Sequence, residues 1–185
     1  RARKVECIYN WIAEEIKEAK KAYDCSSNKI LTVGRLGKEK GYDLLVEVAK
    51  KILPSHQDWR WHIYGSGEMR QMLEEKIEEY HLEDQLVLKG NVEHAYRYYL
   101  DYAFLVLPSY REGIETGPNE IIEDCRNGYL IPPYDLEQMG QRMVELMEDK
   151  AKRESFAIYK GKKEKFSKNT ILKQWISLIE GLHEK

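Results

Sequence analysis

The sequence predicts an α/β domain, a doubly wound parallel sheet with helices on both of its faces. Three observations lead to this prediction. Short apolar runs alternate with amphipathic segments, most runs end at a glycine or a proline, and the segments between them are long enough to form helices. Parallel strands need such crossovers, and ligands of these sheets bind at the carboxyl ends of the strands. The turns that follow the strands are therefore the candidate sites.

Apolar runs followed by turns are predicted as strands. They lie at 29–33, 61–64, 86–88 and 103–107, and 129–131 is predicted to be the last strand of the sheet. Helices are predicted at 41–52, after 67 and at 95–100, where apolar residues recur at helical spacing. The inner faces of the first two helices are predicted to carry Leu44, Leu45, Val48, Ala49 and Ile52, and Met69, Met72, Leu73, Ile77 and Tyr80.

The C-terminal third is predicted to be helical, with two apolar stripes. One stripe consists of Leu136, Met139, Met143 and Leu146, and the other of Ile171, Leu172, Trp175, Leu178, Ile179 and Leu182. We interpret both stripes as core-facing rather than as cofactor or membrane surfaces.

The composition is that of an ordinary folded domain. With 185 residues, 42% of them hydrophobic and 34% charged, the chain can bury a core, and a net charge of -2 gives no general attraction to nucleic acid. Cys7, Cys25 and Cys125 are too scattered for a disulfide framework, which favours a reducing, cytoplasmic compartment. No apolar run is long enough to cross a membrane, and the opening residues 1–4 suggest a fragment of a longer protein.

The turn from 33 to 41 is the first candidate site. It leaves the first strand, turns on glycines and enters a helix, with cations on the way. Gly34 lets the backbone approach a ligand, and the helix start offers unpaired N–H groups. Arg35 can hold two phosphate oxygens at once, whereas Lys40 acts as a point charge. A solvated basic turn explains the same residues, and the physical argument alone leaves the two interpretations even.

Two further turns follow strands. The Gly-Ser-Gly turn at 65–67 is interpreted mainly as a tight turn, with ligand contact as a secondary role. It is no dinucleotide fingerprint, because Gly34 and Gly37 follow the first strand in place of Gly-x-Gly-x-x-Gly. Glu112 follows the fourth strand and is expected to face the same cleft. The histidines show no ligand spacing, so no metal site is predicted, and His62 is interpreted as a satisfied core residue.

Four segments in order then resemble a known family, the GT-B, family 4 (group 1) glycosyltransferases, in their C-terminal domain. They are ILTVGRLGKEKGYDLLVEVAKKI, WHIYGSGEMRQMLEEKIEEYHLEDQLVLKGNV, AFLVLPSYREG and GPNEIIEDCRNGYLIPPYD. Each motif is only moderately specific, but the four in this order make a strong signal, and the resemblance runs from about 4 to 182.

The resemblance implies a Rossmann-like, donor-binding half of a retaining enzyme. Such an enzyme takes a sugar from a nucleotide-diphosphate donor without a bound metal or other cofactor. Gly34, Arg35, Lys40 and Gly41 match the family's Gly-Arg…Lys-Gly motif, whose cations neutralise the diphosphate as the bond to the sugar breaks.

The same resemblance assigns the other parts of the donor. Asn91 and Val92 match a turn whose backbone lies against the nucleotide base. Glu112 matches the first of two paired glutamates and is implied to bind hydroxyls of the donor sugar. Gly65 and Gly113 complete the predicted donor-binding set.

After Gly113 the sequence departs from the family pattern. A helix with a second glutamate and then a strand are expected before 116–120, but Gly113 runs through 114 and 115 straight into that loop. A parallel crossover needs a dozen or more residues. An orphaned position in the sheet would expose unpaired backbone, so we favour a segment omitted near 113–115 over a protein that lacks this unit.

The predicted organisation has three parts, a linker-proximal segment at 1–28, a nucleotide-sugar-binding domain at 29–168 and a crossover helix at 169–185. Full enzymes of this fold bind a sugar or lipid-linked acceptor through an N-terminal domain. We therefore expect little transfer by this chain alone, exposure of Trp11 and Trp175, and a full protein that is cytoplasmic or peripheral to the inner face of a membrane.

Two rival functions remain for comparison. One is a degenerate, binding-only domain of the same fold. The other is a dinucleotide-dependent oxidoreductase, which the absent glycine fingerprint and the lack of an acidic residue at the end of the second strand disfavour.

Overall fold

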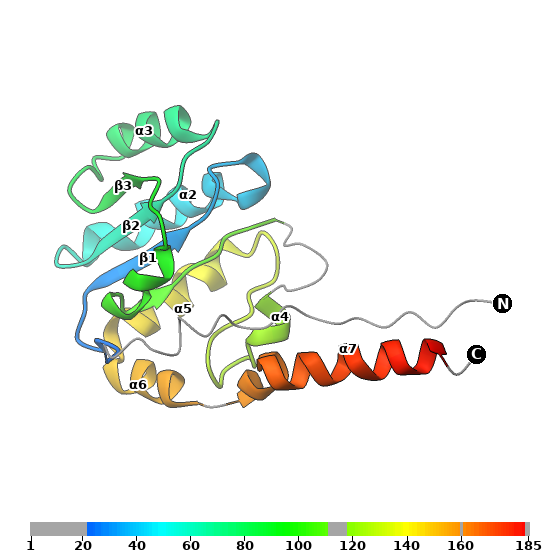
Figure 1. Cartoon of the computed structure of the whole chain (residues 1–185). Helices are drawn as coiled ribbons and strands as arrows, with labels where there is room; N and C mark the ends of the chain where they lie inside the picture. The colour runs from blue at the N-terminus through cyan, green and yellow to red at the C-terminus, as the bar shows by residue number, and fades with distance from the viewer. Residues whose placement is uncertain (1–21, 111–117, 160, 184–185) are drawn as a thin grey trace. The chain divides into compact units, whose positions relative to one another are not determined.

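The computed structural model describes residues 22–110, 118–159 and 161–183. These residues belong to two compact units, whose helices and strands Figure 1 labels. The larger unit contains 22–110 and 131–158, and the smaller one contains 118–130, 159 and 161–183. The division of the chain predicted from its sequence remains a prediction.

The larger unit is built on a parallel sheet, which confirms the predicted fold class. Its strands are β1 (Lys29–Val33), β2 (Arg60–Tyr64), β3 (Leu86–Gly90) and β4 (Phe104–Leu105). Their order is β3-β2-β1-β4, so the chain moves outward from β1 to β3 and then returns to the other side of β1. The direction reverses between β1 and β4, and ligands of such sheets bind beside this point, at the carboxyl ends of the strands.

β4 is shorter than the strand predicted at 103–107. Val106 donates its N–H to the carbonyl of Leu31 (2.8 Å), but its own carbonyl accepts the hydroxyl of Thr32 (2.9 Å) instead of continuing the ladder. Pro108 then follows, and proline has no N–H to donate to a neighbouring strand. Regular pairing is therefore confined to the two residues of β4.

Three helices of the larger unit, α2 (Tyr42–Ile52), α3 (Arg70–Glu79) and α5 (Leu136–Glu148), share one apolar core with the sheet. The unit also contains α6 (Lys150–Ile158), in which Arg153 is buried, and the short turns η1 (Lys38–Lys40), η2 (Leu53–Ser55) and η3 (Ala95–Asp101). Ile30, Trp61 and Ile63 are the strand residues at the centre of this core. Trp61 is fully buried and donates its indole N–H to the hydroxyl of Thr32 (3.0 Å).

The predicted inner faces of these helices are largely confirmed. Buried members of the predicted stripes are Leu45, Val48, Ala49, Ile52, Leu73, Ile77 and Met143. Leu44 is only half-buried, and in α5 the deeper residue is Met147 rather than the predicted Leu146.

The smaller unit contains α4 (Pro118–Ile121), η4 (Gly161–Phe166) and α7 (Lys168–His183). The strand predicted at 129–131 is wrong, because no strand forms there. In the tight turn before it, Cys125 donates its N–H to the carbonyl of Gly128 (2.9 Å), and Leu130 donates its N–H to the carboxylate of Asp124 (3.0 Å). A side chain thus accepts the backbone hydrogen bond that a neighbouring strand would need.

The apolar stripe of α7 is mostly exposed. Ile171 is fully buried, but Leu172, Trp175 and Ile179 are exposed, so the prediction that this stripe faces a core is wrong for them. The separate expectation that Trp175 is exposed is confirmed, while Trp11 lies outside the described residues. Helical spacing shows that a stripe exists, but not what covers it.

Two glycines of the larger unit give a matched stability test. Gly41 links η1 to α2 with φ +65°, and a Cβ there would lie 2.1 Å from the carbonyl oxygen of Pro108. In α5, a Cβ on Gly140 would meet only Ile52 and Val48, at 3.6 and 3.9 Å. We expect Gly41→Ala to lower the free energy of unfolding by more than about 1 kcal/mol, and Gly140→Ala to raise it by up to about 1 kcal/mol.

Urea unfolding of both variants and the unsubstituted chain measures these changes. Equal stability of Gly41→Ala and the unsubstituted chain would contradict the described contact between the β1 turn and the segment after β4.

Candidate functional site

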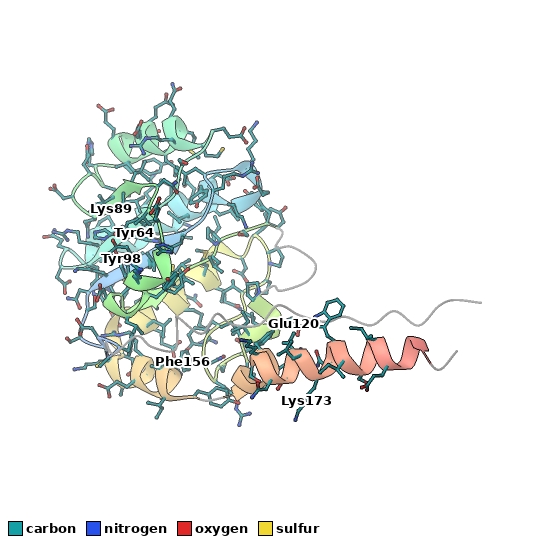
Figure 2. The ribbon with its side chains drawn as sticks, viewed as in Figure 1. Tyr64, Lys89, Tyr98, Glu120, Phe156 and Lys173 are labelled. Carbon is teal, nitrogen blue, oxygen red and sulfur yellow. The ribbon has the colours of Figure 1, made fainter. Side chains whose placement is uncertain are left out.

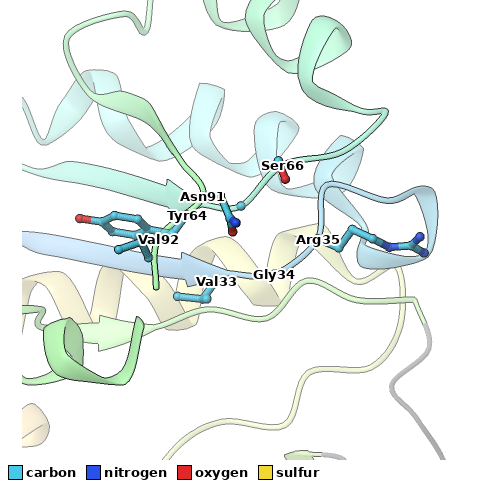
Figure 3. Close-up of a pocket in the computed structure, with 8 residues that line it drawn as sticks. Val33, Gly34, Arg35, Tyr64, Ser66, Asn91 and Val92 are labelled. Carbon is cyan, nitrogen blue, oxygen red and sulfur yellow. The ribbon is translucent and has the colours of Figure 1, made fainter. Parts of the chain in front are cut away.

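A cavity of about 280 Å³ lies at the carboxyl ends of β1, β2 and β3 (Figure 3). It is lined by Val33, Gly34, Arg35, Tyr64, Gly65, Ser66, Asn91 and Val92. This is the edge at which the sequence predicted a site. Pockets for whole small-molecule ligands usually measure about 300–1,000 Å³, so this one can enclose part of a nucleotide sugar rather than all of it.

Backbone hydrogen bonds join the three turns around the cavity. Gly65 donates its N–H to the carbonyl of Gly90 (2.8 Å), and Gly34 donates its N–H to the carbonyl of Tyr64 (3.0 Å). A Cβ on Gly65 would lie 1.9 Å from the carbonyl oxygen of Gly34, and its φ is +150°. Only glycine fits such an approach, so Gly65 both makes the tight turn and lines the cavity.

Arg35 lines the cavity, but its guanidinium is held by an acid of the same turn. Its Nη2 lies 2.7 Å from Oε1 of Glu39, and the Arg35 side chain is 73% exposed. Figure 3 shows this side chain directed away from Tyr64 and Asn91. The hydrogen bond and charge of Glu39 raise the pKa of Arg35, and the same contact lowers the pKa of Glu39. Both groups are therefore charged at neutral pH.

The remaining predicted residues divide into two sets. Lys40 lies in η1, where its N–H donates to the carbonyl of Gly37 (3.1 Å), and it is not among the residues that line the cavity. Glu112, Gly113 and the predicted gap near 113–115 lie outside the described residues.

The β1 turn also contacts the segment that follows β4. Tyr110 donates its N–H to the carbonyl of Glu39 (3.1 Å), and its hydroxyl donates to the carboxylate of Asp43 at the start of α2. Burial, together with this carboxylate, raises the pKa of Tyr110 to about 12. The Arg35–Lys40 turn is thus fixed beside the point where the strand order reverses.

Sequence reasoning missed Tyr64, which is among the residues that line the cavity and whose ring stacks on Tyr98 with centroids 5.8 Å apart and planes 12° apart (Figure 2). The hydroxyl of Tyr102 donates to the hydroxyl oxygen of Tyr64 (3.2 Å) and also lies 2.9 Å from Nδ1 of His62. One signal was present in the sequence. His62 and Tyr64 are two residues apart in a strand and therefore share one of its faces, and a tyrosine-rich segment follows at 96–102.

His62 is hydrogen-bonded, as predicted, but it is half-buried and lies outside the core cluster, so the prediction of a core residue is wrong. Burial, assisted by Lys89 and other nearby cations, lowers its pKa to about 4. Because the single proton of the Tyr102 hydroxyl is donated to Tyr64, the Tyr102 oxygen accepts the Nδ1–H of His62. The tautomer is therefore assigned by this hydrogen-bond chain.

Within 22–110, 118–159 and 161–183, no group of three or more His, Cys, Asp or Glu side chains could hold a metal ion. In those same ranges no helix combines the length and the apolar character needed to span a bilayer.

The parallel sheet, with helices around it and a cavity at its strand ends, defines an α/β domain of the doubly wound class. Residues 13–114 match the model of the family described as Glycosyl transferases group 1, and the chain belongs to this family.

Curated relatives extend well beyond this chain. The poly(ribitol-phosphate) alpha-N-acetylglucosaminyltransferase of Staphylococcus aureus is 28% identical over 168 residues, which cover 80% of this chain and 34% of the relative. The amylovoran biosynthesis glycosyltransferase AmsD of Erwinia amylovora is 27% identical over 172 residues, covering 82% and 48%. The chain thus spans between a third and a half of the length of these relatives.

Solved structures share the fold. The crystal structure of a S. aureus TarM variant in complex with fondaparinux, alpha-GlcNAc-glycerol and UDP matches with a TM-score of 0.83 and 26% identity, over 92% of this chain and 38% of TarM. The C-terminal domain of the group 1 protein LpcC from Francisella tularensis matches in fold, with a TM-score of 0.64 and 22% identity, over 82% of this chain and 91% of that domain.

The alignment with the S. aureus relative contains more positions than there are aligned residues of this chain. It spans 168 positions but takes in only 80% of 185 residues, so about 20 positions face no residue here, more than the dozen that a parallel crossover needs. The family match also ends at residue 114.

The pKa of His62 gives a pH-dependence test. Its folded pKa of about 4 lies below the usual 6.5, so the unfolded chain binds the proton first as pH falls. The stability contributed by neutral His62 is fully present above pH 6.5 and is lost between 6.5 and 4. The variant His62→Asn keeps a side-chain N–H donor but does not titrate in this range. Between pH 7 and 4.5, we expect its free energy of unfolding to fall by about 1–2 kcal/mol less than that of the unsubstituted chain, a figure reduced for the partial exposure of His62.

Urea unfolding at the two pH values measures this difference. Identical pH dependence of the two proteins would show that burial and the nearby cations do not lower the pKa of His62.

Proposed function

We propose that this chain binds a nucleotide-diphosphate sugar at its strand ends, and that the parent protein is a retaining glycosyltransferase. The sugar would pass to a polysaccharide, lipid-linked or small acceptor, without a bound metal. One observation carries the proposal: in a chain of the group 1 family, a cavity at the ends of three parallel strands is flanked by the Arg35–Lys40 turn.

Arg35 and Lys40 are proposed to hold the diphosphate. They follow β1 and precede α2, whose start offers backbone N–H groups to an anion. Arg35 must first leave Glu39. An exposed ion pair contributes about 0–1 kcal/mol, whereas a charge-assisted contact to phosphate contributes about 1.5–3 kcal/mol, so the exchange favours the ligand.

These cations also suit the chemistry of transfer. When the bond between the sugar and the diphosphate breaks, negative charge grows on the departing diphosphate oxygen. Cations already placed beside that oxygen stabilise the charge as it develops, which is the role that a metal ion has in other enzymes. Glu112 is proposed to orient the sugar through its hydroxyls, as the family resemblance implies.

The named relatives support a polymeric acceptor. The S. aureus relative is named for transfer of N-acetylglucosamine to poly(ribitol-phosphate), and the E. amylovora relative for biosynthesis of amylovoran. The chain spans only 34% and 48% of the length of these two relatives. We therefore expect the chain to bind its donor weakly and to transfer little by itself.

Removal of both cations tests the phosphate site. Arg35→Ala combined with Lys40→Ala should weaken UDP binding by at least 100-fold, because two charge-assisted contacts of about 1.5–3 kcal/mol each are lost. Lys51→Ala, at an exposed position near the end of α2, is the matched control and should bind UDP as the unsubstituted chain does.

Isothermal titration calorimetry with UDP measures the three affinities. Unchanged affinity in the double variant would refute the assigned phosphate site. An unsubstituted chain that binds no nucleoside diphosphate would overturn the proposed function itself.

A further inference from the structure

Tyr64 is the one aromatic side chain among the described residues that line the cavity. Its ring stacks on Tyr98, and the ring of Tyr102 meets it edge-on, with centroids 6.5 Å apart and planes 86° apart. Neither contact belongs to the predicted phosphate site. Tyr64 therefore places an aromatic ring, held by two neighbouring rings, at this end of the cavity.

A hydrogen-bond chain holds that ring in place. His62 donates to Tyr102, and Tyr102 donates to the hydroxyl oxygen of Tyr64. Tyr102 is buried and His62 is half-buried, so the hydrogen-bond chain is shielded from solvent at Tyr102 and partly shielded at His62. A buried chain whose donors and acceptors are matched fixes side-chain orientation more firmly than packing alone.

Asn91 supplies polar groups beside this ring. Its side-chain amide makes no hydrogen bond with other described residues, and it can both donate and accept. Figure 3 shows Asn91 and Val92 near the Tyr64 end of the cavity, with Arg35 at the opposite end. A flat group with an apolar face and polar edges fits this combination, which is the chemistry of a nucleobase.

The strand order decides which end of the donor lies here. Tyr64 and Asn91 follow β2 and β3, on one side of β1, whereas β4 lies on the other side of β1. A diphosphate beside Gly34 and Arg35 would stand between the two, with the nucleoside toward β2 and β3.

We propose that Tyr64 is a specificity-determining residue that forms a wall against the nucleobase of the donor, and that Tyr102 and His62 are positioning residues that hold its ring. This inference rests on the proposed function and names the side chains that distinguish a nucleotide from a bare diphosphate.

The test compares UDP with inorganic pyrophosphate, which has the phosphates but no base. Loss of an aromatic contact to a base typically weakens binding about 5- to 150-fold. Tyr64→Leu should weaken UDP binding by about 10-fold and leave pyrophosphate binding unchanged. Tyr102→Phe keeps the ring of Tyr102 and removes only the hydroxyl, and it should produce a smaller loss with the same selectivity.

Tyr99→Leu is the matched control, because Tyr99 is exposed, lies in the same turn and does not line the cavity. It should bind both ligands as the unsubstituted chain does. Circular dichroism of each variant checks that the fold is retained.

The outcomes separate this inference from the proposed function. If Tyr64→Leu weakens the binding of UDP and of pyrophosphate equally, or the binding of neither, the proposed contact between Tyr64 and the base is refuted. The proposed phosphate site is not contradicted by either result. If the unsubstituted chain binds neither UDP nor pyrophosphate, the proposed function fails and this inference fails with it.

Discussion

The cavity depends on how closely backbone segments approach where the strands end. At Gly65 a Cβ would lie 1.9 Å from the carbonyl oxygen of Gly34, so the second turn can rest on the first only without a side chain. That approach brings the N–H of Gly65 to the carbonyl of Gly90 and the N–H of Gly34 to the carbonyl of Tyr64. The main chain alone therefore joins three strand ends, and a larger residue at 65 would separate them and remove the cavity.

The positive charge of the site is local, and part of it is already paired. The chain carries a net charge of -2, and Arg35 is paired with Glu39 within one turn. Such an exposed pair contributes little stability, so Arg35 can exchange Glu39 for a stronger anion. The backbone contact from Tyr110 to Glu39 fixes the turn itself, so an exchange of partners needs movement of the Arg35 side chain rather than of the fold.

Features that depend on local sequence pattern could be predicted from the sequence, whereas features that depend on tertiary packing could not. The parallel α/β sheet and the turns at Gly34 and Gly65 follow from periodicity and glycine placement, while Asn91 was found through the family resemblance. Tyr64 was missed because its role depends on η3 folding onto the strand face beside it. The strand predicted at 129–131 does not form, because the backbone N–H of Leu130 donates to the carboxylate of Asp124. The composition of the segment does not indicate this hydrogen bond.

One measurement tests the central claim most directly, namely where a nucleoside diphosphate binds. In a ¹H–¹⁵N NMR titration of the chain with UDP, we predict that the largest shifts occur at the backbone amides of Gly34, Gly65 and Asn91, which surround the cavity. The amide of Gly140, in α5 and outside the cavity lining, should not move. Shifts concentrated away from the three strand ends, or no shifts at saturating UDP, would contradict the account.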